Sequence, residues 1–154
     1  MTREMMQLIN GSLCANIGFV DENGKPNIRR VYCTWHKGIG GHLISSNVSS
    51  RHVQSLLKNS DACLYFENSE RFKGICLNGK VIVHCDREFK EMLWMEGDEQ
   101  YYPNGIDDED YCVLEFIAES GRFFRFEGSV DLTGEDIQEN DKDAQWTDFY
   151  SRFI

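Results

Sequence analysis

The sequence predicts a mainly β fold (α+β class), in which six or seven short antiparallel strands form a barrel flanked by a few helices. Two observations support this class. Short apolar runs typical of strands recur over most of the chain, and turn signals such as Asp21-Glu22-Asn23-Gly24 separate them. The helical patterns between these runs are too few for the regular alternation of strand and helix that builds a parallel sheet.

The N-terminal third is expected to form a short helix followed by three strands. Thr2 can cap a helix over residues 3–9, which Asn10-Gly11 would end. The expected strands cover residues 13–20, 26–35 and 42–46. In the second of them, alternation places Arg29 and Val31 on one face and Arg30 on the other.

The middle of the chain is expected to contain two helices and four further strands. Ser49 or Ser50 can cap a helix over residues 51–58, and Asp86 can cap another that runs to about Met95. The expected strands cover residues 62–66, 74–85, 111–118 and 122–127.

Some segments interrupt or follow these strands. Gly79 predicts a bulge or a turn, and Glu119-Ser120-Gly121 predicts a turn. Residues 96–110 are expected to form an acidic loop. The chain is expected to be one domain over residues 1–154, with an acidic tail from about residue 129. Four aromatic residues in that tail are spaced like one face of a short helix: Trp146, Phe149, Tyr150 and Phe153.

The net charge excludes some classes of function. The 154 residues include 16 Lys and Arg against 26 Asp and Glu, a net charge of −10, which disfavours nucleic acid as a partner. The charge is uneven: residues 1–95 carry 12 basic against 9 acidic residues, and residues 96–154 carry 4 against 17. The first part can therefore still bind a small anion. The acidity of the second part can equally be no more than solvated surface.

Neither a membrane span nor a secretory signal is predicted. No apolar run approaches the roughly 18 residues of a membrane helix, and the first residues lack the apolar core of a signal peptide. We therefore expect a cytoplasmic protein with no membrane partner.

The cysteines and histidines predict no metal site. The six cysteines contain no CxxC pair, so they are expected to be reduced residues within strands. His36 and His42 flank the glycine-rich turn at residues 38–41 and are expected on the surface.

One region combines cations and hydroxyl groups in a way that suits a phosphate. Arg29 and Arg30 lie on a predicted strand, and Ser50, Arg51 and His52 open a predicted helix. A helix N-terminus presents unpaired N–H groups and the positive end of its dipole, so these side chains would complete an anion site. The alternative is an ordinary capped helix beside a solvated strand.

Four segments of the sequence together resemble a known family. They are Gly-Lys-Pro-Asn-Ile-Arg-Arg-Val at residues 24–31, the run from Leu43 to Leu56, Leu-Asn-Gly-Lys-Val at 77–81, and Tyr-Tyr-Pro-Asn-Gly at 101–105. In order and spacing they resemble the pyridoxamine 5′-phosphate oxidase-like superfamily of FMN-binding split barrels, in its general-stress-protein branch. The resemblance covers roughly residues 5–128.

The resemblance implies a split barrel that binds FMN at a homodimer interface. Arg29 matches the strand arginine that contacts the FMN phosphate. His52 stands where the family usually has Lys, which would replace a permanent cation by a group that titrates near neutral pH. The implied cofactor-binding residues are Arg29, Arg30, Val31, Tyr32, Ser45, Ser46, Ser50, Arg51 and His52. Candidates for aromatic cover of the flavin, from a partner chain, are Trp94, Tyr102 and Trp146.

The implied function is an FMN-dependent oxidoreductase that transfers hydride between FMN and a nicotinamide or small organic substrate. Lys73-Gly74-Ile75 departs from the Arg-Gln-Val of true pyridoxamine 5′-phosphate oxidases, and their Arg-Pro-x-x-Ser segment is missing, which argues against vitamin B6 synthesis. A flavin-binding stress protein without turnover, and a barrel that binds haem or deazaflavin, remain alternatives. No acid–base pair is recognisable, so no catalytic residue is assigned.

Overall fold

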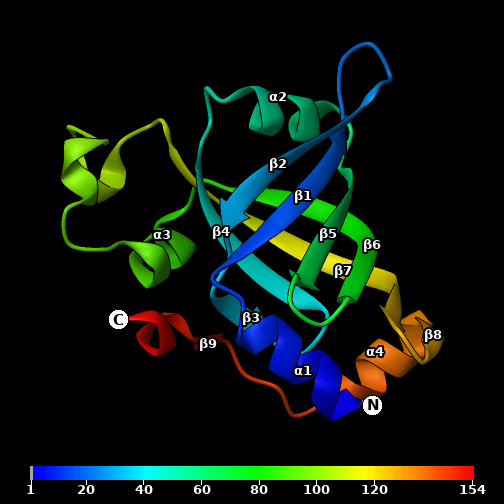
Figure 1. Ribbon diagram of the computed structural model, residues 1–154. Coiled ribbons are helices and arrows are strands. Elements are labelled where there is room, and N and C mark those ends of the chain that lie inside the picture. The colour runs from blue at the N-terminus through cyan, green and yellow to red at the C-terminus, as the bar shows by residue number, and fades with distance from the viewer. Residues whose placement is uncertain (1) are drawn as a thin grey trace.

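The computed structural model describes residues 2–154, and within them the chain forms one curled antiparallel sheet (Figure 1). Neighbouring strands follow the order β2-β1-β5-β6-β7-β4-β3-β9, and β8 pairs with β7 beside this path. The predicted class, a mainly β barrel with a few helices, is confirmed. The sheet of the described residues has nine strands rather than the six or seven expected.

The strands are β1 (Cys14–Val20), β2 (Pro26–Tyr32), β3 (Trp35–Lys37), β4 (Gly41–Asn47), β5 (Asp61–Asn68), β6 (Lys73–His84), β7 (Tyr111–Arg125), β8 (Gly128–Leu132) and β9 (Thr147–Asp148). The helices are α1 (Thr2–Asn10), α2 (Arg51–Lys58), α3 (Arg87–Leu93) and α4 (Gly134–Asp141), with short 3₁₀ turns η1 (Asp98–Gln100), η2 (Gly105–Asp107) and η3 (Tyr150–Phe153).

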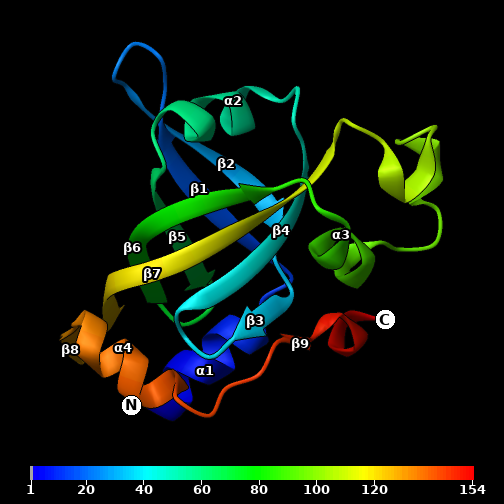
Figure 2. The same ribbon diagram turned by 180° about the vertical axis from the view of Figure 1, so that it is seen from behind.

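Two helices lie at opposite ends of the curled sheet, α2 at one end and α1 at the other (Figures 1 and 2). Each begins and ends within a residue or two of its expected position. The apolar face of α2 buries Val53 and Leu56, and α1 buries Met5 and Ile9, in the same main core as the strands. Both helices therefore turn their apolar faces into the core of the curled sheet.

The pairing of β6 with β7 contains the predicted bulge and corrects the predicted turn. The register shifts beside Gly79, which pairs with Ala118, whereas Asn78 pairs with Ser120. Glu119 is thus the extra residue of a bulge within one continuous strand, and the turn expected at residues 119–121 was wrong. A Cβ at Gly79 would overlap the carbonyl oxygen of Ile117, so the close approach of the two backbones favours glycine there.

The acidic tail folds back onto the sheet. Thr133 caps α4 through a capping box, in which its hydroxyl accepts a bond from the Asp136 N–H and the Asp136 carboxylate accepts one from the Thr133 N–H. The helical spacing of the tail aromatics was wrong for Trp146, because the chain there is extended and continues into β9, which pairs with β3. Of the four aromatic residues, only Tyr150 and Phe153 lie in a helical segment, the short turn η3.

Asp141 at the end of α4 joins the tail to the turn between β3 and β4. Its carboxylate accepts hydrogen bonds of 2.8 Å from the backbone N–H groups of both Ile39 and Gly40. This turn follows His36 and precedes His42, which are buried with 1% and 0% exposure. The expectation that these histidines lie on the surface was therefore wrong, because a segment about 100 residues away in the sequence covers the turn.

No cysteine among residues 2–154 forms a disulfide bond, as expected for reduced residues. The six cysteines are free: Cys33 and Cys112 are buried, Cys14, Cys63 and Cys76 are half-buried, and Cys85 is exposed. None of the helices among residues 2–154 is long and apolar enough to cross a membrane.

We predict that Asp141→Ala lowers the free energy of unfolding by about 2–3 kcal/mol. The loss follows because two hydrogen bonds to a charged acceptor disappear, each worth about 1.5–3 kcal/mol when desolvated, while water can reach part of the freed turn. Urea denaturation measures the change. Asp143→Ala, an exposed acidic position nearby, should change stability by less than about 0.5 kcal/mol; equal losses in the two variants would contradict the anchoring role.

Candidate functional site

A cleft of about 790 Å³ lies between β2, the β3–β4 region, the segment after α3 and the C-terminal residues. Its volume is within the range of roughly 300–1,000 Å³ that is usual for small-molecule sites. The residues that line it are Leu13, Cys14, Arg29, Arg30, Val31, Tyr32, Thr34, Trp35, Leu43, Ser45, Ser46, His52, Leu93, Met95, Asp98, Tyr101, Asp148, Tyr150 and Phe153.

Seven of the nine residues expected to bind the cofactor line this one cleft. They are Arg29, Arg30, Val31, Tyr32, Ser45, Ser46 and His52. The other two, Ser50 and Arg51, do not line it. The Ser50 hydroxyl donates to the carbonyl of Asn47, and the Arg51 side chain is 71% exposed and lies 3.8 Å from the carboxylate of Asp21.

Strand register in β2 and the short connection from β4 to α2 bring these residues to one cleft. In β2, Arg29 pairs with the fully buried Ile17 and Val31 with Ala15, so Arg29 shares the inward face and Arg30 takes the other face, as alternation predicted. Because the N-terminus of α2 follows β4 after a short turn, it brings His52 next to Ser46.

A chain of hydrogen bonds links Arg29, His52 and Ser46. The Arg29 Nη1 lies 3.1 Å from His52 Nδ1, and His52 Nε2 lies 2.8 Å from Ser46 Oγ. Since a guanidinium can only donate, His52 Nδ1 accepts, and the ring proton is on Nε2 and points to Ser46. Both ring nitrogens are therefore engaged, and the imidazole holds the guanidinium in position.

The charge state of His52 differs from the expectation of a group that titrates near neutral pH. Burial of the ring, with the positive charge of Arg29 beside it, lowers the pKa of His52 to about 4. His52 is thus a neutral support for Arg29 rather than a weaker substitute for a lysine cation.

The aromatic wall of the cleft consists mostly of residues that were not expected to contact a cofactor. They are Trp35, Tyr101, Tyr150 and Phe153, together with Tyr32 from the expected set. Trp94, Tyr102 and Trp146 do not line the cleft. They belong to a second apolar cluster around Leu43, where the Tyr102 hydroxyl donates to the Ser46 carbonyl at 3.2 Å. The close spacing of Tyr150 and Phe153 was a sequence signal, but it did not reveal which surface they cover.

The C-terminal segment is fixed at the edge of the cleft by Thr34. Its hydroxyl donates to Asp148 Oδ1 at 2.9 Å, and its carbonyl accepts from the N–H of Phe149 at 2.9 Å. This places Asp148 in a cleft that also contains Asp98 and the two arginines of β2. The cleft thus combines two arginines with two acidic side chains.

Comparison with known proteins finds clear similarities. Residues 1–125 match the family described as pyridoxamine 5′-phosphate oxidase. A protein from Clostridium acetobutylicum related to general stress protein 26 of Bacillus subtilis is 39% identical and has a TM-score of 0.78, over 88% of this chain and 96% of that one. A search of the curated proteins finds no match.

Two more distant structures share the fold. General stress protein 26 from Bacillus anthracis is 13% identical, with a TM-score of 0.70 over 86% of this chain and 97% of that one. A haem-binding protein from Mycobacterium smegmatis is 16% identical, with a TM-score of 0.65 over 90% of this chain and 60% of that one.

We predict that His52 makes the ligand-free protein less stable in acid. Its pKa is about 4 in the folded state and about 6.5 in the unfolded state, so only the unfolded chain gains the proton as the pH falls between these values. The full contribution is present above pH 6.5, and up to about 3 kcal/mol of it is lost by pH 4.

The measurement compares urea unfolding of the wild type and His52→Gln across this pH range. The glutamine variant cannot titrate, so the stability difference between the two proteins should shrink as the pH falls. A difference that stays constant from pH 7 to pH 4 would show that His52 is not buried as a neutral ring.

Proposed function

Because the chain belongs to the pyridoxamine 5′-phosphate oxidase family, we propose that its cleft binds FMN and that the protein is an FMN-dependent oxidoreductase. The observation that carries this proposal is the Arg29–His52–Ser46 chain of hydrogen bonds beside the N-terminus of α2. It directs a guanidinium at the cleft where the phosphate of FMN would lie.

The donors near α2 suit a phosphate. Of the five N–H donors of Arg29, one points to His52 and one to the Arg30 carbonyl at 3.3 Å, which leaves others for phosphate oxygens. The first N–H groups of α2 and its dipole add to the attraction. Arg51 would join them by exchanging Asp21 for the phosphate, and Ser50 stands beside it at the N-cap.

The rest of the cleft suits a planar ring. Val31, Tyr32, Ser45 and Ser46 contribute apolar surface and hydroxyl groups to the lining, and Trp35 adds an aromatic ring. When bound, FMN would supply reversible hydride transfer at its N5 atom. The chain itself would position the ring and exclude water, and it would take its substrate from the side of Tyr101 and the C-terminal segment.

A homodimer would complete this site. On the outward face of β2, Ile28 and Tyr32 are 70% and 73% exposed, which is unusual for large apolar side chains next to a ligand cleft. A second copy that packs on this face would bury them and cover the flavin.

The charges of the cleft favour some substrates over others. Asp98 and Asp148 lie on the substrate side, where carboxylates disfavour a second anionic group. The nicotinamide ring of a reduced dinucleotide, or another small uncharged or cationic organic molecule, suits this side better than a phosphorylated vitamer. The free cysteines are in keeping with a reducing, cytoplasmic location.

Haem is the less favoured occupant, although a haem-binding protein shares the fold. Among the described residues, His52 is the histidine that lines the cleft, and both of its nitrogens are engaged. His36 and His42 are buried away from it, so the cleft offers no free imidazole to a haem iron.

The spectrum of the purified protein tests the proposal directly. We expect a yellow protein that absorbs at about 450 nm and releases a chromophore identified as FMN. A colourless protein that takes up no added FMN would overturn it. Steady consumption of NADH or NADPH by the loaded protein then separates an enzyme from a flavin-binding protein without turnover.

We predict that Arg29→Ala weakens FMN binding about 10- to 100-fold. The loss corresponds to about 1.5–3 kcal/mol, the usual contribution of a hydrogen bond to a charged group. Fluorescence titration of the apoprotein with FMN measures it.

The matched control for this variant is Arg122→Ala. Arg122 is an exposed arginine that pairs with Asp131 on the β7–β8 hairpin, and its loss should leave the affinity unchanged. Equal affinity of Arg29→Ala and the wild type would place the phosphate elsewhere.

A further inference from the structure

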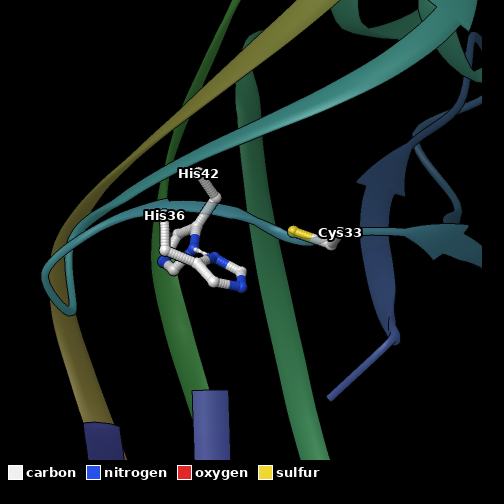
Figure 3. A group of neighbouring side chains, drawn as sticks. All are labelled: Cys33, His36 and His42. Atoms are coloured by element: carbon white, nitrogen blue, oxygen red, sulfur yellow. Dashed lines mark hydrogen bonds between the residues drawn. The ribbon is translucent and has the colours of Figure 1, made fainter. Parts of the chain in front are cut away.

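A second group of chemically active side chains lies inside the barrel, apart from the cleft. Cys33 follows β2, His36 is on β3 and His42 is on β4, and their exposed fractions are 0%, 1% and 0%. One ligand atom from each lies within 4.8 Å of the other two. Figure 3 shows the Cys33 sulfur pointing toward the two imidazole rings.

The hydrogen bonds of the two histidines define where their protons are. His42 Nε2 lies 2.7 Å from the carbonyl oxygen of Ile39 and therefore donates to it. A neutral imidazole carries one proton, so the Nδ1 of His42 is unprotonated. His36 Nδ1, 2.8 Å away, must then donate to it. The remaining nitrogen, His36 Nε2, carries a lone pair.

This lone pair has no partner within residues 2–154, and it is not the only such acceptor nearby. His36 and Asn10 both line a cavity of about 360 Å³ between α1 and the C-terminal segment. Among the described side chains, Asn10 Oδ1 and His36 Nε2 are two of the three buried polar atoms without a hydrogen-bond partner. Buried acceptors without donors are uncommon in folded proteins, and they point to a donor or a cation at this position.

We propose that Cys33, His36 and His42 bind a zinc ion, with a fourth ligand supplied from the adjacent cavity by water or Asn10. Thiolate and imidazole are the ligands that Zn²⁺ prefers, and bond lengths of about 2.3 Å to sulfur and 2.0–2.1 Å to nitrogen place neighbouring ligand atoms within the observed 4.8 Å. His42 is already oriented as a zinc ligand, since its other nitrogen donates to a backbone carbonyl.

Zinc binding at this cluster releases one proton per ion. Zinc binds the Cys33 thiolate, so the thiol proton leaves to solvent. Each imidazole keeps one proton. His42 retains it on Nε2 and binds the ion through Nδ1, so the hydrogen bond from His36 Nδ1 to this atom breaks. His36 holds its proton on whichever nitrogen does not bind the ion.

The sequence predicted no metal site here because it contains no CxxC pair. The spacing Cys-x-x-His followed by a second histidine six residues later is local, but the turn at residues 38–41 folds β3 against β4 and brings the two rings together. Zinc would cross-link the segment after β2 to β3 and β4. This segment also lines the cleft, because Thr34 and Trp35 lie between Cys33 and His36.

Metal titration of the full-length protein, freed of any affinity tag and stripped with a chelator, tests the proposal. We expect one Zn²⁺ per chain and release of one proton per zinc. We also expect Co²⁺ to give the visible bands of a four-coordinate site with a thiolate ligand.

Variants at the cluster and a matched control complete the test. Cys33→Ser should weaken zinc binding by more than about 100-fold, since loss of an outer-shell partner alone can cost that much. His42→Gln gives the same comparison if Cys33→Ser does not fold. The control is Cys112→Ser, an equally buried thiol outside the cluster, which should bind zinc as the wild type does.

Two results would overturn the proposal. One is a wild type that binds neither metal, which would leave buried water as the partner of His36 and Asn10. The other is a folded Cys33→Ser or His42→Gln variant that binds zinc as tightly as the wild type. Neither result depends on FMN, so the test is independent of the proposed function.

Discussion

The pairing of β6 with β7 is the constraint on which the rest of the barrel depends. The ladder runs from Gly74 and Phe124 to His84 and Val113, with a bulge at Glu119. Before the bulge, the other edge of β7 pairs with β4; after it, the same strand pairs with β8. Because a bulge bends a strand and increases its twist, one long strand can serve two partners that face different directions. The cleft depends on this arrangement, since β4 carries Ser45 and Ser46.

The inside of such a small barrel contains more polar groups than an apolar core tolerates without pairing. Two chains of hydrogen bonds through histidines pair these polar groups, and each chain has a defined direction. One chain runs from Arg29 through His52 to Ser46, and its charged end faces the cleft. The other runs from His36 through His42 to the carbonyl of Ile39, and at its His36 end Nε2 has no partner within residues 2–154. In our two proposals, the Arg29 end of the first chain contacts an anion and the His36 end of the second contacts a cation.

Local patterns predicted those parts of the fold that are decided locally. The helix at residues 51–58, the bulge at Gly79 and the phase of Arg29 and Val31 follow from spacing within a single element. The failures have a long-range cause. His36 and His42 are buried because Asp141 and Phe149 cover their turn, and no pattern within residues 36–42 contains that information. The continuity of β7 through Glu119-Ser120-Gly121 likewise depends on β6, whose backbone replaces the turn that these residues favour alone.

The segment between β2 and β3 links the two sites physically. Cys33 and His36 lie in the buried cluster, whereas Thr34 and Trp35, between them, line the cleft. Thr34 also holds the C-terminal segment through Asp148 and Phe149, and the Phe149 ring stacks on His36 at 5.8 Å. A shift of His36 must therefore move either Trp35, which belongs to the aromatic wall, or Phe149, which precedes Tyr150 of that wall. The rigidity of the buried cluster thus determines how precisely that wall is placed against a ligand in the cleft.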